Sequence, residues 1–300
     1  MQKNGELSNP VIIGGVGGSG TRVVAEIISH LGYYFGDDLN AAKDNLLFLL
    51  LFKRPRWFSR ARYDKIKIFT GLSLFSKVML QKKVPNLSEL RFLIQAVFEI
   101  SIYGHNHKGD GRGTWPFLRV WHMIPRRLKM TLNQRRWGWK EPNSHIYLEY
   151  LAAYYSNMKY IHTIRHGLDM AFSLNQQQLY NWGPILGLDL PKSRSDEPAA
   201  SLKYWLKSNR RAMEIGEKIG DRRFLTVNYD RLCMSPRSEI QKILSFLDIE
   251  QNIGNLTAVN RIPIIPKSLG RYRAHNISQF NPADLKELED LGFSTTVDYL

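Results

Sequence analysis

The sequence predicts an α/β fold in which helices cover both faces of a central parallel sheet. Short apolar runs alternate with helical patterns, and a glycine-rich loop joins the first run to the first helix. Strands that alternate with helices form parallel sheets, which are buried on both faces. The expected strands are residues 11–13, 137–140, 160–164 and 224–228, and the expected helices after the first are residues 144–156, 168–180 and 200–219.

The first strand, loop and helix form the most informative segment. The expected strand runs into a loop with five glycines in residues 14–20, and apolar positions at helical spacing follow in residues 23–31. Glycines let backbone N–H groups close around an anion, and the start of a helix adds partial positive charge. Ser19 and Thr21 add hydroxyl donors. The sequence therefore predicts a bound phosphate or similar oxyanion near residues 15–22.

Three classes of protein use such a loop, and the Walker A class of ATPases and kinases is disfavoured. The Walker A loop needs a Lys before a Ser or Thr. Here Gly20 is in place, but Thr21 occupies the position of the Lys.

The second class binds dinucleotides through the pattern GxGxxG, which Gly15, Gly17 and Gly20 match. This pattern requires an acidic residue about 20 positions further on, at the end of a second strand. Asp37 falls close to that position, but residues 32–36 make a weak second strand. An NAD(P)-dependent oxidoreductase is therefore the alternative function.

A segment in the middle of the chain favours the third class. Residues 160–164 indicate a strand that ends at Arg165, and a helical pattern with Asp169 and Ser173 follows. Arg presents a planar fork of donors to a dianion, and a continuous helix places Ser173 two turns further on, close to the same face. This segment resembles that of sulfotransferases that use 3′-phosphoadenosine-5′-phosphosulfate (PAPS). In that family an Arg at the end of a central strand and a Ser eight residues later hold the 3′-phosphate.

Further segments extend the resemblance to the sulfotransferase family. Residues 140–142 are similar to the Lys-Asp/Glu-Pro element of bacterial and protein-tyrosine sulfotransferases, and residues 229–232 resemble the Tyr-Glu-x-Leu segment near the adenine. Residues 240–247 resemble the helix that ends in Phe-Leu-Gly, and residues 268–273 resemble the late Gly-Arg-Trp-Arg element. The segments occur in the family's order and cover most of the chain outside residues 41–136.

The resemblance implies a fold, a co-substrate and a reaction. The fold is the P-loop NTPase-like sulfotransferase fold. PAPS is the co-substrate, and an acceptor hydroxyl takes its sulfuryl group without a metal ion. The first loop is expected to hold the 5′-phosphate, and Arg165 with Ser173 the 3′-phosphate. The residues expected to bind the nucleotide are Gly17, Gly18, Ser19, Gly20, Thr21, Arg22, Arg165, Ser173, Tyr229, Lys267 and Arg271.

The sequence departs from the family at two places. Many members have Lys or Arg directly before the Ser-Gly-Thr of the first loop, where this chain has Gly18. Either Arg22 replaces that charge or Lys140 acts alone. The late Arg-Lys-Gly triplet of cytosolic animal sulfotransferases has no clear match, and Lys267 is the nearest basic residue. The missing charge at Gly18 keeps a third function open, a non-catalytic nucleotide-binding module with a basic face for membranes or polyanions.

Sulfuryl transfer requires charge neutralisation at the leaving oxygen and a base for the acceptor hydroxyl. Lys140 follows an aromatic strand and is expected to reach the bridging oxygen or the sulfonate, with Arg22 as a second cation. Glu141 and His145 are equal candidates for the base. Glu141 is adjacent to Lys140, and a neutral imidazole has a suitable pKa. The histidines in residues 105–122 are further candidates.

The composition of the chain limits its disulfide bonds, metal sites and membrane-spanning segments. The single Cys233 excludes an internal disulfide, and no His or Cys cluster has the spacing of metal ligands. The longest apolar run, residues 46–52, is far shorter than the roughly 20 residues that span a membrane. Residues 1–9 contain no apolar signal region. We therefore expect a single domain over residues 1–300, in the cytoplasm and with peripheral membrane contact as an option.

The net charge of +15 lies entirely in residues 41–136, which hold 20 Lys and Arg against 5 Asp and Glu. Residues 46–52 and 90–102 have helical patterns, so we expect a helical, basic insertion that binds the acceptor. An acidic acceptor, a lipid surface or a solvated face each accounts for the charge. A glycan or lipid-linked glycan is the favoured acceptor. Nucleic acid is not expected, because no recognition motif occurs, and nothing indicates the oligomeric state.

Overall fold

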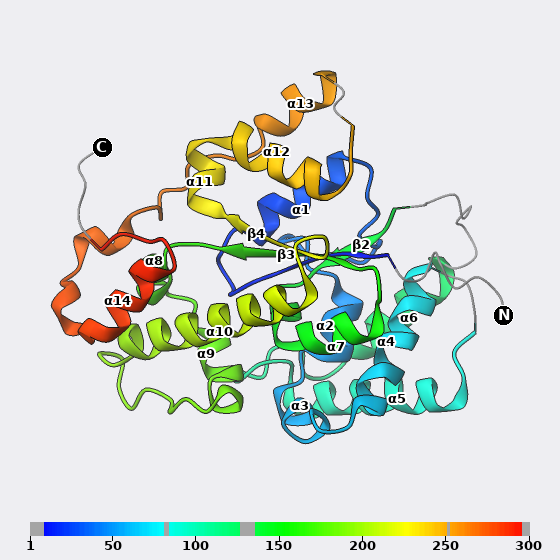
Figure 1. Cartoon of the computed structure of the whole chain (residues 1–300). Coiled ribbons are helices and arrows are strands. Elements are labelled where there is room, and N and C mark those ends of the chain that lie inside the picture. The colour runs from blue at the N-terminus through cyan, green and yellow to red at the C-terminus, as the bar shows by residue number, and fades with distance from the viewer. Residues whose placement is uncertain (1–8, 81–83, 127–135, 251–252, 296–300) are drawn as a thin grey trace.

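The structure, a computed structural model, describes residues 9–80, 84–126, 136–250 and 253–295 (Figure 1). Its sheet has four parallel strands in the order β2-β1-β3-β4. Each strand lies within one residue of its predicted position, and the predicted fold class is confirmed. The strands are β1 (Val11–Gly14), β2 (Gly138–Lys140), β3 (Lys159–Ile164) and β4 (Phe224–Asn228).

The strands are apolar because helices cover both faces of the sheet. Ile13 and Ile161 pack into the upper layer of Figure 1, and Ile12 and Tyr160 pack into the lower one. The upper layer contains α1 (Thr21–His30), α11 (Tyr229–Met234), α12 (Pro236–Phe246) and α13 (Ile253–Asn260). The lower layer contains α2 (Leu46–Phe52), α4 (Lys65–Leu80), α7 (Leu148–Tyr154) and α10 (Glu197–Ile219).

The described part of residues 41–136 is helical and shares the core of the sheet. α2 is apolar and buried at every position, and its Phe48 ring stacks on Trp139 of β2 with 5.3 Å between ring centroids. Further from the sheet lie α3 (Pro55–Ala61), α5 (Leu87–Tyr103) and α6 (Trp115–Arg126). One hydrophobic core therefore joins this segment to the strands that carry the first loop.

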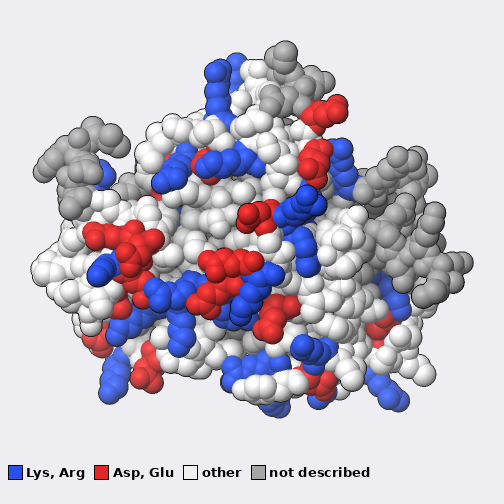
Figure 2. All heavy atoms as spheres, viewed as in Figure 1, with Lys and Arg blue, Asp and Glu red and all other residues white. Residues whose placement is uncertain are grey.

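Some of the basic side chains of residues 41–136 form ion pairs. On the face of the molecule that Figure 2 shows, basic and acidic side chains lie among one another rather than in fields of one sign. Four pairs between described residues use basic residues of this segment, namely Arg54 with Glu99, Lys67 with Asp64, Lys77 with Glu89, and Arg119 with Asp38.

Two predicted helices have other boundaries in the structure. The one predicted for residues 144–156 begins as a 3₁₀ turn, η1 (Pro142–Tyr147), which continues into α7. The one predicted for residues 168–180 is divided into α8 (Gly167–Ala171) and α9 (Gln177–Trp182). The remaining elements are η2 (Pro184–Leu186), η3 (Arg271–Ala274), η4 (Ile277–Gln279) and α14 (Pro282–Asp290).

The division between α8 and α9 has a local cause. The side-chain amide of Gln176 donates hydrogen bonds to the carbonyl oxygens of Met170, Ala171 and Ser173, at 2.8–3.1 Å. These bonds satisfy carbonyl groups at the end of a helix and stop its propagation. The prediction that Ser173 lies on one continuous helix after Arg165 was therefore wrong.

Candidate active site

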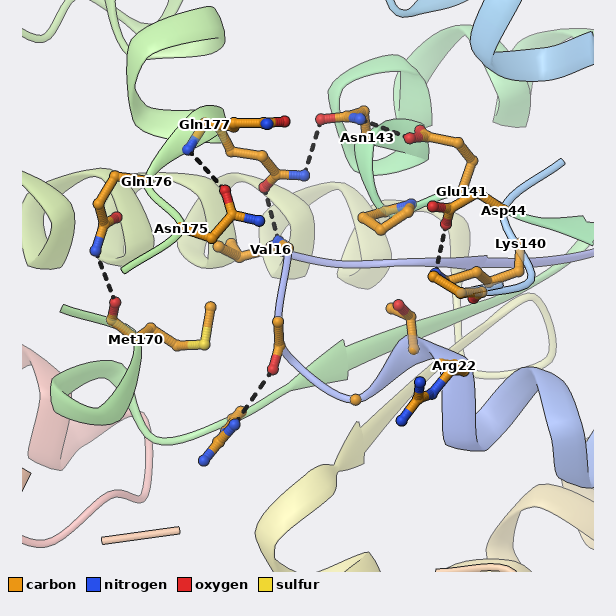
Figure 3. A pocket seen from close by; sticks show the side chains of 18 of the residues that line it. Val16, Arg22, Asp44, Lys140, Glu141, Asn143, Met170, Asn175, Gln176 and Gln177 are labelled. Atoms are coloured by element: carbon orange, nitrogen blue, oxygen red, sulfur yellow. Dashed lines mark hydrogen bonds and ion pairs between the residues drawn. The ribbon is translucent and has the colours of Figure 1, made fainter. Parts of the chain in front are cut away.

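A cavity of about 570 Å³ opens at the carboxyl ends of β1, β2 and β3 (Figure 3). Ligands of open α/β sheets bind in this position, because the loops that follow the strands meet there. The loop after β1, the end of β2, the end of β3 and the segment 41–136 all contribute to the wall. Its predicted site residues are Gly17, Gly18, Gly20, Thr21, Arg22, Lys140, Glu141, Arg165 and Tyr229.

The glycine loop adopts a backbone that requires glycine. Gly18 and Gly20 have φ values of 95° and 86°, in the left-handed region. A Cβ atom on Gly20 would lie 2.0 Å from the Tyr229 ring, and one on Gly15 would lie 2.3 Å from the carbonyl oxygen of Thr163. The loop is therefore fixed by the residues behind it as well as by its own conformation.

The loop and the start of α1 present unused backbone donors. The N–H of Ser19 bonds to the carbonyl oxygen of Val16 at 3.0 Å. In the described part of the chain, the N–H groups of Gly18, Gly20, Thr21 and Arg22 have no acceptor. Consecutive N–H groups at the start of a helix form a site for an oxyanion. These four N–H groups lie on residues of the cavity wall, so the donor set fits a phosphate.

Arg165 extends from the end of β3 toward this loop. Its Nη1 atom lies 3.5 Å from the carbonyl oxygen of Gly18, so the two segments that the sequence singled out meet in the structure. Its Nη2 atom donates to Asp169 Oδ2 at 3.2 Å and to the Ser268 hydroxyl at 3.0 Å. The guanidinium group is also 5.6 Å from the centroid of the Tyr229 ring. Arg165 is therefore buried at the cavity wall in one fixed position.

Asp169 holds the late segment of the chain against Arg165. Its Oδ2 atom accepts a hydrogen bond from the Gly270 N–H at 2.7 Å, and its Oδ1 atom accepts one from the Tyr272 N–H at 3.2 Å. Ser268 lies on the cavity wall as a result. This explains in physical terms why an Asp four residues after the Arg belongs to the site.

Several predicted nucleotide ligands do not reach the cavity. Ser173 lies in the turn after α8, where its hydroxyl accepts a hydrogen bond from the Asn175 N–H at 3.3 Å. Lys267 is exposed, and Arg271 donates to the carbonyl oxygen of Phe172 at 3.5 Å. Ser19 is fully buried behind the loop rather than on the cavity wall.

Lys140, at the end of β2, is paired inside the cavity wall. Its Nζ atom lies 2.5 Å from Asp44 Oδ1 and 3.0 Å from the carbonyl oxygen of Ala42, and Figure 3 shows the pair. The lysine is only 2 % exposed. A buried ammonium requires such a counter-ion, because desolvation of an unpaired charge is costly. Sequence reasoning missed Asp44, since a single Asp in a loop carries no motif.

Glu141 is fixed by a chain of hydrogen bonds that begins at the glycine loop. The Gly17 N–H donates to Gln178 Oε1 at 2.8 Å, and Gln178 Nε2 donates to Asn143 Oδ1 at 2.8 Å. Asn143 Nδ2 then donates to Glu141 Oε1 at 2.6 Å, as Figure 3 shows. Burial and the nearby Asp44 raise the pKa of Glu141 to about 7. At neutral pH this carboxyl therefore exchanges protons readily.

The structure does not bring His145 to the cavity. This ring is 1 % exposed, its Nδ1 atom lies 2.8 Å from the carbonyl oxygen of Pro142, and its Nε2 atom lies 3.4 Å from the Tyr204 hydroxyl. Burial lowers the pKa of His145 to about 3. His105 does line the cavity, and burial lowers its pKa to about 4. The side chain of His122 lies outside the described residues.

The end of the cavity opposite Arg165 is built from the segment 41–136. Ala42, Asp44, Leu49, Lys53, His105 and Asp110 form it. This end combines an apolar side chain, two carboxylates, an ammonium group and an imidazole. It lies beyond Lys140 and Glu141 as seen from the glycine loop, so a second substrate can approach the same two side chains.

Two searches of the described residues gave negative results. No group of three or more His, Cys, Asp or Glu side chains in that part of the chain is placed to hold a metal ion. No helix described here is both long enough and apolar enough to cross a membrane.

The structure is that of an α/β protein whose glycine loop presents backbone N–H groups to a cavity, with a buried lysine and a buried glutamate beside it. The chain belongs to the sulfotransferase family, whose model, described as "Sulfotransferase family", matches residues 10–252. It is therefore a sulfotransferase, and PAPS is the donor that this family uses. A search of the curated proteins found no match.

This chain is similar to several solved structures, of which the first shows the same fold. The sulfotransferase domain of the olefin synthase of Synechococcus PCC 7002 is 18% identical, with 96% of each chain covered and a TM-score of 0.50. The sulfotransferase domain from the curacin biosynthetic pathway is 14% identical, covers 97% of this chain and 93% of its own, and gives a TM-score of 0.45. The sulfotransferase STF9 from Mycobacterium avium is 14% identical over 85% of this chain and 67% of its own, with a TM-score of 0.44.

The close approach of Tyr229 to the glycine loop predicts that Gly20→Ala disables nucleotide binding. The new methyl group would overlap the Tyr229 ring, and Ala tolerates the left-handed backbone poorly. We expect the affinity for 3′-phosphoadenosine-5′-phosphate (PAP), measured by calorimetry, to fall at least about tenfold. Gly113→Ala is the matched control, because Gly113 also has positive φ but no atom lies within 4 Å of the added methyl. Equal affinities in the two variants would contradict the proposed tight fit.

Proposed function

We propose that PAPS binds between the glycine loop and Arg165 and that its sulfuryl group is transferred beside Lys140 and Glu141. The observation that carries this proposal is the meeting of Arg165 with the loop, 3.5 Å from the Gly18 carbonyl oxygen. The unused N–H groups of the loop and the Thr21 hydroxyl hold the 5′-phosphate, and Arg165 holds the 3′-phosphate. The adenine lies near the Tyr229 ring.

The proposed sulfuryl transfer uses the side chains of Glu141, Lys140 and Arg22. Glu141 takes the proton of the acceptor hydroxyl, and the acceptor oxygen attacks sulfur. The bond between sulfur and the 5′-phosphate oxygen breaks, and PAP leaves with that electron pair. Lys140 neutralises the charge that develops on the leaving oxygen, while Asp44 keeps the ammonium group in position. Arg22, on the first turn of α1 at the cavity wall (Figure 3), supplies the charge that is missing at Gly18.

The acceptor enters from the side of residues 41–136. Lys53, His105 and Asp110 form a polar end with the size and donor pattern to bind hydroxyl-bearing molecules. We favour a glycan or a lipid-linked glycan, because polar groups and Leu49 lie side by side there. Transfer of labelled sulfate from PAPS to acceptors of each class identifies the true one.

The alternative functions have less support. The second strand that a dinucleotide-binding fold requires is reduced to an isolated bridge between Tyr34 and Trp137. A non-catalytic module has no need for a buried lysine and a buried glutamate at the end of one strand. Burial of both groups is costly, and catalysis is the reason we propose for it.

Arg165→Ala is expected to weaken the binding of PAP by about 100-fold, because the 3′-phosphate loses its charge-assisted donors. Lys267→Ala is the matched control, since this lysine lies outside the cavity wall and its loss should leave affinity within about twofold. Titration calorimetry with PAP measures both. If Arg165→Ala binds PAP as the unmodified protein does, the proposed nucleotide site is wrong.

The rate of sulfuryl transfer is expected to rise with pH up to about 7 and then to level off, because the ionised form of Glu141 accepts the proton and its pKa is about 7. Glu141→Gln should lower kcat by about 10²- to 10⁴-fold with PAP affinity unchanged. His105→Gln tests the other candidate base. A rate that rises through pH 4 instead, or the loss of activity in His105→Gln alone, would assign the base to His105.

We also propose that this enzyme is cytoplasmic and contacts membranes through α5 and α6. Large apolar side chains at spacings of three and four residues are exposed along α5, and Phe117 of α6 packs on Phe98 with 6.1 Å between ring centroids. The segment also carries the whole positive excess of the chain, which attracts anionic lipid. We define the apolar face as Leu87, Leu90, Ile94, Phe98, Ile102, Phe117 and Trp121.

Vesicle sedimentation tests the apolar face. The protein is expected to bind vesicles that contain phosphatidylserine and to leave them as the salt concentration rises. The double variant Ile94→Glu, Phe98→Glu should bind at least about tenfold more weakly. Met234→Glu, which changes an exposed apolar residue on the other side of the sheet, is the control. Absence of binding by the unmodified protein, or equal binding by the double variant, rejects this role.

A further inference from the structure

A second cavity, of about 370 Å³, lies next to the first and contains an excess of arginine. It is formed by the start of α3, the end of α5, the loop that follows α5, and α9. Arg54, Arg56 and Arg112 line it, with Glu99 as the one carboxylate among its lining residues. No step proposed above uses these residues.

Arg54 is the most buried of these cations. It is 1 % exposed, its Nη1 atom donates to Glu99 Oε2 at 3.1 Å, and its Nε atom donates to the carbonyl oxygen of Leu51 at 3.0 Å. Its Nη2 atom has no acceptor among the described residues. Trp57 and Phe92 lie against the guanidinium group and hold it in place.

A second unpartnered donor belongs to the same cavity. The Asn181 Oδ1 atom accepts a hydrogen bond from the His107 N–H at 2.8 Å, so the Nδ2 atom of that amide is the donor that remains. It too is buried and without an acceptor among the described residues. Buried donors are almost always paired, and a pair of unpaired ones indicates a missing acceptor group.

Flat aromatic surfaces border the charged side chains. The His107 ring stacks on Tyr180 with 4.7 Å between centroids, and the Arg56 guanidinium lies 4.4 Å from the centroid of the Tyr103 ring. Such surfaces pack against a ring, while Arg forks bind carboxylate or sulfate in the plane of the donors. The cavity therefore fits a ring that carries an oxyanion.

The two cavities share a wall. Neighbouring residues in three segments line one cavity or the other: Lys53 and Arg54, His105 and Asn106, and Leu179 and Tyr180. The second cavity therefore lies beside the one that contains Glu141.

From this geometry we infer that the second cavity binds the carboxylate or sulfate of an acidic sugar residue in the acceptor. This inference rests on the proposed function, since it specifies that the glycan acceptor of the sulfuryl group is acidic. The site itself is defined by Arg54, Arg56, Arg112 and Asn181. The exposed guanidinium groups of Arg56 and Arg112 bind the anion, and Arg54 and Asn181 line the cavity beside it.

Glucuronate, used as its methyl glycoside, and methyl glucoside are the probes, because they differ only in the carboxylate at C6. Binding is measured by calorimetry with saturating PAP, so that the phosphate sites of the first cavity are filled. We expect glucuronate to bind about tenfold or more tightly than methyl glucoside. The double variant Arg56→Ala, Arg112→Ala should remove that preference. These two arginines are exposed, so the test does not depend on changing the buried Arg54.

Arg91→Ala is the matched control, because this arginine is exposed on α5 and lies outside the cavity. It should keep the preference for glucuronate. Equal binding of the two probes by the unmodified protein, or a preference that survives in the double variant, overturns the inference. This binding measurement does not require sulfuryl transfer, so a negative result would leave the proposed function standing. The proposed function is tested separately, by the Arg165→Ala titration and by the transfer of labelled sulfate.

Discussion

The parallel pairing of β1 with β3 is the constraint on which the active site depends. Its register places Gly14 opposite His162, two residues before the end of β3, so the glycine loop passes along the end of β3 toward Arg165. The pairing also limits the residue types that are allowed, because a Cβ atom on Gly15 would meet the carbonyl oxygen of Thr163 at 2.3 Å. Backbone packing therefore requires part of the glycine loop, and anion binding uses the N–H groups that this backbone exposes.

The ion pair of Lys140 with Asp44 joins the reaction centre to the segment 41–136. Burial of a lone ammonium at the end of a strand is unfavourable, and the counter-ion comes from the loop just before α2. α2 is in turn held under the sheet by Phe48 and Trp139. The segment that forms part of the cavity wall thus shares both a core and an electrostatic pair with β2, as the proposed function requires if one cavity is to serve both substrates.

The sequence was sufficient where a local pattern determines the structure. Buried parallel strands are continuous apolar runs, so all four were located to within one residue, and the glycine loop with Arg165 was found from spacing. Ser173 was misplaced because a side-chain amide, that of Gln176, ends α8, and helical periodicity does not show such an interruption. Asp44 was missed because its role is set only by a contact distant in sequence. His145 was a reasonable candidate base by residue type. Its burial against Pro142 could not be predicted, because it depends on the three-dimensional structure.

The orientation of the amide chain limits how far burial raises the pKa of Glu141. The indole N–H of Trp182 can only donate, and it lies 2.7 Å from Asn143 Oδ1, so the NH₂ group of Asn143 must face Glu141. That hydrogen bond stabilises the ionised carboxylate and opposes the larger effect of burial, which favours the protonated form. Gln178 Nε2 also donates to Asn143 Oδ1, which fixes the same orientation of the Asn143 amide. The Oε1 atom of Gln178 accepts the hydrogen bond of the Gly17 N–H. The N–H groups available to a phosphate therefore begin at Gly18, and one rigid chain sets both the anion site and the orientation of the carboxyl group.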